Sequence, residues 1–188
     1  MKRKVFTLLF TMVMGLSLFS QEQEIAKDSI KYDMINFGLG IGQDYGGMGV
    51  NLAVYPEKHI GLFIGGGYAF AGFGYNAGVK IRFVSEKKYQ PVNFFIIAMY
   101  GYNASIAVAD AERFNKLFYG PTAGIGLDIG PRKPNKGYFS FSINVPFRSP
   151  DVNDYMDDLE KNHGVEFQSG LIPISFTLGY KFALEGMK

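Results

Sequence analysis

The sequence predicts an all-β protein with the architecture of an eight-stranded antiparallel up-and-down transmembrane β-barrel. The first observation is composition: the 188 residues include 24 glycines, 18 phenylalanines and 12 tyrosines, and abundant glycine disfavours helices. The second is an alternation of apolar with small or polar residues through most of the chain between Met34 and Leu184. The third is the position of the strand charges, which fall on the small and polar side of this alternation.

Eight segments have the two-residue period of an extended strand. In order along the chain they are residues 34–42, 47–55, 59–70, 73–84, 92–103, 117–130, 137–147 and 171–184. The last segment shows the pattern clearly, because Phe176 and Leu178 alternate with Thr177 and Gly179. The segment at 92–103 is apolar on both faces, so the sequence leaves open which of its faces points outward.

The apolar side of the strand alternation is predicted to face lipid. A soluble barrel would carry charged residues outside, whereas here Lys80, Arg82, Asp128 and Lys181 share the small and polar parity. A charge that faces lipid near the middle of a bilayer costs ~2–4 kcal/mol, which explains this restriction. We therefore predict that these four residues form a charge cluster inside the barrel. Since an eight-stranded lumen is narrow, Asp128 is expected to pair with Arg82 or Lys80, and Lys181 to reach the lumen mouth or water.

The N-terminal segment has the order of a secretory signal peptide. Three basic residues at 2–4 precede an apolar run at 5–19, and the small Ser20 comes before a polar stretch. Residues 1–20 are therefore predicted to be a signal peptide, since the apolar run is shorter than the ~20 residues that span a bilayer. Residues 21–33 are predicted to be a periplasmic lead-in, and 34–184 the barrel domain. Without those three bases, 16 basic residues remain of 19, against 17 acidic ones, which removes the electrostatic basis for binding nucleic acid.

Loop lengths predict how the barrel is oriented. The connections at 56–58, 85–91 and 131–136 are short, as periplasmic turns are, whereas 104–116 and 148–170 are longer, as extracellular loops are. This arrangement places both termini in the periplasm.

The longest loop carries the signals of a helix. Ser149 could cap it, Pro150 could take the first helical position, and Gly164 could end it. An apolar stripe at helical spacing is formed by Val152, Tyr155, Met156 and Leu159. We expect a lid packed on the barrel rim, and the alternative is a surface for a partner or ligand.

No catalytic, cofactor-binding or metal site is predicted. The chain has no cysteine, and the glycines at 38, 40 and 42 lie inside a strand, where no dinucleotide fingerprint occurs. His163, Glu166 and Ser169 are residue types that an acyl-ester hydrolase could use. Their spacing specifies no such site, so the chain is not expected to be an enzyme or to need a cofactor.

The C-terminal strand resembles the assembly signal of outer-membrane barrels in Thr177, Gly179, Phe182 and Leu184, although the chain continues to Lys188. Over residues 34–184 the chain resembles the small eight-stranded outer-membrane proteins of Gram-negative bacteria, of the OmpA-barrel and OmpX type. The resemblance implies contact with outer-membrane lipid and, through the last strand, with the barrel-assembly machinery. The expected role is a non-catalytic structural or surface-interaction one, with an unknown surface ligand. The alternatives are a narrow pore or a lipid A-modifying enzyme.

Overall fold

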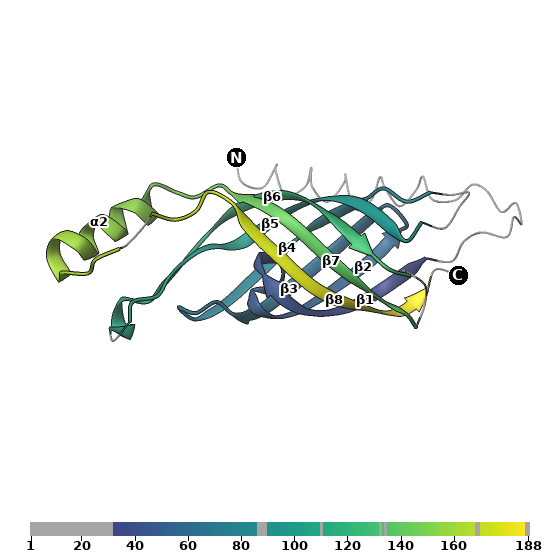
Figure 1. Cartoon of the computed structure of the whole chain (residues 1–188), viewed down its shortest axis with the longest axis horizontal. Coiled ribbons are helices and arrows are strands. Elements are labelled where there is room, and N and C mark those ends of the chain that lie inside the picture. Colours follow the sequence, from purple (N-terminus) through teal and green to yellow (C-terminus); the bar gives the residue numbers. More distant parts are fainter. Residues whose placement is uncertain are drawn as a thin grey trace, which may run out of the picture.

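The fold is a closed barrel of eight antiparallel strands in up-and-down order, as the sequence predicts (Figure 1). The computed structural model describes residues 32–85, 90–109, 111–131, 133, 135–167 and 170–186, without the side chains of 185 and 186. The predicted signal peptide at 1–20 and the lead-in up to residue 31 lie outside the described residues. The last strand pairs with the first in antiparallel register from Asp33 to Ile41, which closes the barrel.

The strand bounds agree with the predicted segments to within a few residues. The strands are β1 Asp33–Gly42, β2 Gly47–Glu57, β3 Ile60–Tyr68, β4 Phe73–Arg82, β5 Val92–Ile106, β6 Lys116–Ile129, β7 Gly137–Pro146 and β8 Ser175–Gly186. The helical elements are η1 Gln43–Tyr45, η2 Glu112–Phe114 and α2 Asp151–His163. One prediction was wrong in detail: residues 171–174 precede the last strand instead of opening it.

The barrel has two ends that differ in their connections. The terminal rim contains the start of β1, the end of β8 and the connections β2–β3, β4–β5 and β6–β7. The arm rim contains the connections β1–β2, β3–β4, β5–β6 and β7–β8. Beyond the arm rim, α2 and the tip of the β5–β6 hairpin project away from the barrel (Figure 1).

The structure decides the parity of β5, which the sequence leaves open. Phe95, Ile97 and Met99 are buried inside the barrel, whereas Phe94 and Ile96 are exposed on its outer surface. The three inward side chains join an apolar cluster in the interior with Ala53, Tyr55 and Phe63. This strand is apolar on both faces because one face packs in the interior and the other belongs to the apolar exterior.

A second apolar core lies in the arm, which we define as the described residues of 104–118 and 148–171. Ala104 and Ile106 at the end of β5 are buried against Val152 and Leu159 of α2. A register shift between Tyr102 and Ala104 marks the point where the hairpin leaves the barrel, in keeping with the bend that a bulge introduces. In the described part of the chain, no helix is long and apolar enough to cross a membrane.

Candidate functional site

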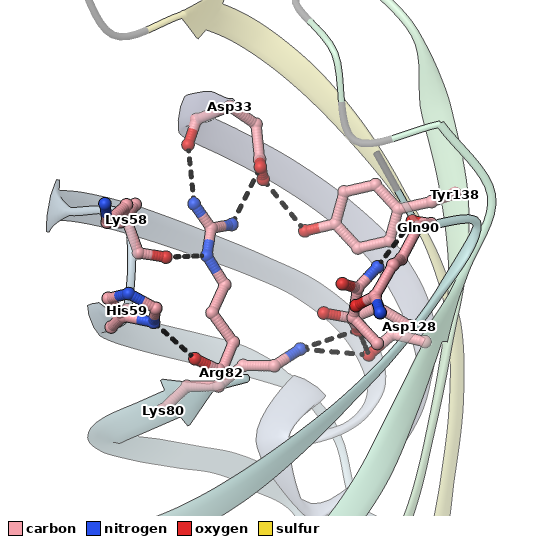
Figure 2. Close-up of polar contacts among 10 residues, drawn as sticks. Asp33, Lys58, His59, Lys80, Arg82, Gln90, Asp128 and Tyr138 are labelled. Carbon is pink, nitrogen blue, oxygen red and sulfur yellow. Dashed lines mark hydrogen bonds and ion pairs between the residues drawn. The ribbon is translucent and has the colours of Figure 1, made fainter. Parts of the chain in front are cut away.

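An ion pair closes the barrel interior at the terminal rim. Arg82 Nη1 donates to Asp33 Oδ1 at 2.7 Å, and both side chains are fully buried. Figure 2 shows the Arg82 side chain between Asp33 and Lys58, whose carbonyl oxygen accepts from Nε. The guanidinium lies over the Tyr55 ring, 3.7 Å from its centroid, and the Tyr138 hydroxyl donates to Asp33 Oδ2 at 3.3 Å. The terminal end of the lumen is thereby filled by a satisfied charge pair.

Asp33 was missed by the sequence analysis, which placed it in the periplasmic lead-in. Simple alternation would also turn it outward, because the inward residues of β1, such as Asn36, have even numbers. Register shifts on both sides of Ile35 reverse the parity at the start of β1. The bulge therefore turns the Asp33 carboxylate into the lumen, where it meets Arg82.

The predicted ion pair of Asp128 is present in the next layer of the lumen, with Lys80 as its partner. Lys80 Nζ lies 2.8 Å from Asp128 Oδ1, and both residues are almost completely buried (Figure 2). Ser140 Oγ donates to the same carboxylate oxygen at 2.8 Å. The ammonium group also lies 3.5 Å from the centroid of the Phe95 ring. Arg82 takes Asp33 instead, so the two acids divide the two bases between them.

The expectation that Lys181 reaches the lumen mouth or water is wrong. Its side chain is buried, and Nζ donates to Asn51 Oδ1 at 3.1 Å. The same ammonium group lies 5.8 Å from the centroid of the Tyr45 ring. Lys181 is retained inside because β2 supplies an amide acceptor and η1 supplies an aromatic face, neither of which parity alone reveals.

The short connection η1, between β1 and β2, folds into the barrel as a plug that fills the lumen near the arm rim. Gln43, Asp44 and Tyr45 are all buried, although the sequence placed residues 43–46 only as a connection between the first two predicted strands. Amide groups hold the plug in place: Asn51 Nδ2 donates to Asp44 O and Asn76 Nδ2 to Gln43 O, each at 2.7 Å. The barrel interior is therefore packed at this level by its own chain.

Glycines on the inner face make room for the Tyr45 ring. A Cβ atom at Gly40 would lie 2.8 Å from Tyr45 Cε2 and 2.8 Å from the Gly179 Cα, and one at Gly38 would lie 3.1 Å from Tyr45 Cε1. Gly46, which follows the plug, has φ 69° and would meet Gly66 Cα at 2.7 Å. The lumen-facing glycines of the sequence thus serve a local purpose, the close approach of an aromatic ring and a backbone turn.

Tyr45→Ala is expected to lower the free energy of unfolding by about 3–5 kcal/mol, because it leaves a large cavity in the packed lumen. Denaturant unfolding of protein folded in detergent micelles, followed by circular dichroism, measures this. Tyr68→Ala is the matched control, since Tyr68 is exposed on the barrel surface. An equal loss in both variants would show that Tyr45 has no special packing role.

The helix predicted in the longest loop is α2, and Gly164 ends it with φ 67°. The stripe residues face the arm core: Val152 and Leu159 are buried, and Tyr155 and Met156 pack partly against them. The Tyr155 hydroxyl donates to Phe114 O at 2.8 Å. The expectation of a lid on the barrel rim is thereby corrected, because the helix packs on the projecting β5–β6 hairpin. The fifth strand was predicted to end at residue 103, but β5 extends to Ile106, and its added residues Ala104 and Ile106 are apolar partners of the helix.

Arg148 connects the base of the arm to the barrel. It follows β7 and donates from Nε to Asn103 O at 3.3 Å and from Nη1 to Leu171 O at 3.5 Å. Desolvation by burial lowers the pKa of its guanidinium from the ordinary value. Its partners are backbone carbonyls, so Arg148 serves to fix the two chains that lead to and from α2.

The structure does not show His163, Glu166 and Ser169, the residues that an acyl-ester hydrolase could use, close to one another. The His163 ring lies 4.6 Å from the Phe114 ring, and its Nε2 is 4.0 Å from Asp158 Oδ2. Ser169 lies outside the described residues. His59, at the terminal rim, pairs through Nδ1 with Arg82 O at 3.1 Å. Within the described ranges, no three histidine, aspartate or glutamate side chains cluster as metal ligands would.

The outer surface of the barrel is apolar on every strand. Large apolar side chains are exposed on all eight strands, among them Leu39, Leu52, Ile64, Ile81, Phe94, Ile125, Ile143 and Leu178. Among strand residues with described side chains, charges outside the barrel are confined to strand ends, at Glu57 and Lys116. The buried strand charges lie inside and the exterior is apolar, whereas the exterior of a water-soluble barrel carries polar groups.

Comparisons of the chain with protein-family models, with curated proteins and with solved structures find no match.

Proposed function

We propose that this chain is an integral β-barrel protein of the bacterial outer membrane, with a sealed lumen and no catalytic role, which holds its arm at the cell surface as an interaction site. The apolar exterior carries this proposal. Soluble monomers rarely expose a contiguous apolar patch larger than a few hundred Å², whereas here such side chains surround the barrel. Lipid is the surrounding that makes this surface favourable.

The distribution of aromatic residues supports the same surrounding. Near the arm rim the exposed aromatic side chains include Tyr68, Phe73, Tyr75, Tyr100 and Tyr119, and near the terminal rim they include Phe83, Phe94, Phe139 and Phe182. Between them, most exposed residues are aliphatic, such as Leu62, Ile64, Ile96, Ile125 and Ile143. Two aromatic girdles around an aliphatic band are typical of outer-membrane barrels.

Sequence features support the location and the orientation. The n-region, apolar run and small residue of 1–20 favour export, and the last strand resembles the signal by which the barrel-assembly machinery recognises its clients. The longest connection, between β7 and β8, lies on the arm rim, so we place the terminal rim and both termini in the periplasm.

The packed interior supports a sealed barrel over the narrow-pore alternative. Three levels of the lumen are occupied, by the pair of Arg82 and Asp33, the pair of Lys80 and Asp128, and the plug centred on Tyr45. Eight strands enclose just enough room for side chains to fill. We expect no porin-like conductance when the purified protein is added to a planar bilayer, and a large stable conductance would contradict the sealed lumen.

Single tryptophans test the membrane position, because the chain contains none. Ile125→Trp places the fluorophore on the middle of the barrel exterior, and Asn162→Trp places it on the exposed side of α2. In vesicles containing phosphatidylcholine brominated near the middle of its acyl chains, Ile125→Trp should be strongly quenched and Asn162→Trp unaffected. Absence of quenching at residue 125 in a protein with the gel mobility of a folded barrel would defeat the proposal.

A further inference from the structure

The arm has an open groove between α2 and the chain that returns from it. Two neighbouring cavities of about 380 and 240 Å³ lie along this side of the helix. Both are lined by Glu160 and Phe167, so they adjoin each other, and we refer to the two together as the groove. The groove is lined by residues of α2 and of the chain that follows it, in the part of the molecule that projects beyond the arm rim (Figure 1).

The floor of the groove is apolar and held in place from behind. Phe167 and Val165 pack on the arm core on one side and line the groove on the other, and Met156 lines the second cavity. Methionine and phenylalanine present polarisable and aromatic surfaces that accommodate side chains of varied shape. The floor is thus a preformed apolar surface and not a loose loop.

The margin of the groove is acidic. Asp157, Glu160 and Glu166 line the two cavities. Asp157 pairs with Lys161 at 3.1 Å on the exposed surface, whereas Glu160 and Glu166 take part in no ion pair with any described residue. Two carboxylates without an ion-pair partner among the described residues, beside an aromatic floor, attract a cation that also has apolar surface.

We infer that this groove binds a peptide segment that carries a lysine or arginine beside an apolar side chain. The apolar side chain lies on Phe167 and Met156, and the cation lies between Glu160 and Glu166. The inference rests on the proposed function only in that the arm is exposed to the cell exterior. The length of the groove favours an extended segment over a single free amine, because its two cavities are neighbours along the helix.

Gly170 allows the groove to be filled without disturbing the fold. A Cβ atom there would meet no atom within 4 Å, and its φ lies outside the left-handed region. Gly170→Leu should therefore occupy the second cavity. Gly164 cannot be used in this way, since its φ of 67° favours glycine.

Charge reversal at two positions of α2 provides a matched pair. Glu160→Lys changes the groove, whereas Asp158→Lys makes the same change two residues earlier. These positions are about 200° apart around the helix axis, so Asp158 lies on the opposite side from the groove. Both residues are exposed on the surface of α2.

The probe is the peptide acetyl-Gly-Lys-Leu-Lys-Phe-Lys-Gly-amide with a fluorescent label, added to the full-length protein in phosphatidylcholine nanodiscs, with empty nanodiscs subtracted. Fluorescence anisotropy should show saturable binding that weakens with added salt. Glu160→Lys should weaken binding at least about tenfold, Gly170→Leu should weaken it as well, and Asp158→Lys should change it less than about twofold.

Three results would overturn the inference: no saturable binding, equal weakening by Asp158→Lys and Glu160→Lys, or equal binding of a peptide with serine in place of leucine and phenylalanine. The second would indicate diffuse attraction to an acidic helix, and the third a purely electrostatic contact. Unboiled samples should keep the gel mobility of a folded barrel throughout. Failed binding by a barrel that inserts normally removes the groove but not the membrane barrel, whereas failed insertion removes the proposed function.

Discussion

Asp128→Ala should lower the free energy of unfolding of the barrel by about 3–5 kcal/mol. The variant leaves the buried Lys80 ammonium group with Ser140 and the Phe95 ring as its remaining partners. A buried charge that loses its counter-ion has no water to take the place of that counter-ion. Removing one partner therefore destabilises the protein by more than the intact pair contributes to its stability. Urea unfolding in detergent micelles, followed by the mobility of unboiled samples on a gel, measures the loss.

A double variant separates this cause from a general packing defect. The double variant Asp128→Leu, Lys80→Met replaces both charged side chains with apolar ones of similar size. It should therefore regain most of the lost stability. Asp151→Ala on the exposed surface of α2 should change stability by less than about 0.5 kcal/mol. A double variant as unstable as Asp128→Ala would show that the unpaired charge is not the cause.

Ile125→Lys is expected to prevent assembly of the barrel into bilayers. Ile125 lies in the middle of β6, where it pairs with Ile96 of β5 and Ile143 of β7, and it is 66% exposed. A lysine on the lipid face near the bilayer midplane costs about 2–4 kcal/mol, enough to shift the balance of a marginally stable barrel. The yield of the heat-modifiable form after refolding into phosphatidylcholine vesicles measures assembly.

Tyr119→Lys is the depth control for this prediction. Tyr119 has the same outward parity on the same strand, but it lies six residues away, about 20 Å along the strand toward the arm rim. A lipid-facing charge near the interface costs only about 0–1 kcal/mol, so this variant should assemble in good yield. If the exterior faced water, Ile125→Lys and Tyr119→Lys would affect the yield of folded barrel to a similar extent. Equal yields would therefore contradict a membrane position for the exterior.

The sequence by itself determined the strand count, the up-and-down order and the parity of seven strands. These features follow from the period of two, which places large apolar residues such as Leu178 on one face and small or polar ones such as Thr177 on the other. That Asp128 pairs with Lys80 or Arg82 was also predictable, because parity placed these charges in a narrow lumen, and the structure shows Lys80 as the partner. The stripe of α2 was predictable for the same kind of reason, a helical period in an otherwise polar loop.

Only the tertiary structure decided what fills the lumen and what the arm packs against. Asp33 enters the barrel because a bulge reverses the parity of β1, and Tyr45 enters because η1 folds inward where lumen glycines leave space. Lys181 stays inside because Asn51 and the Tyr45 ring come from other strands and connections. These outcomes depend on register, bulges and the volume enclosed by all eight strands at once, whereas the alternation in the sequence records only the side of each strand on which a residue lies.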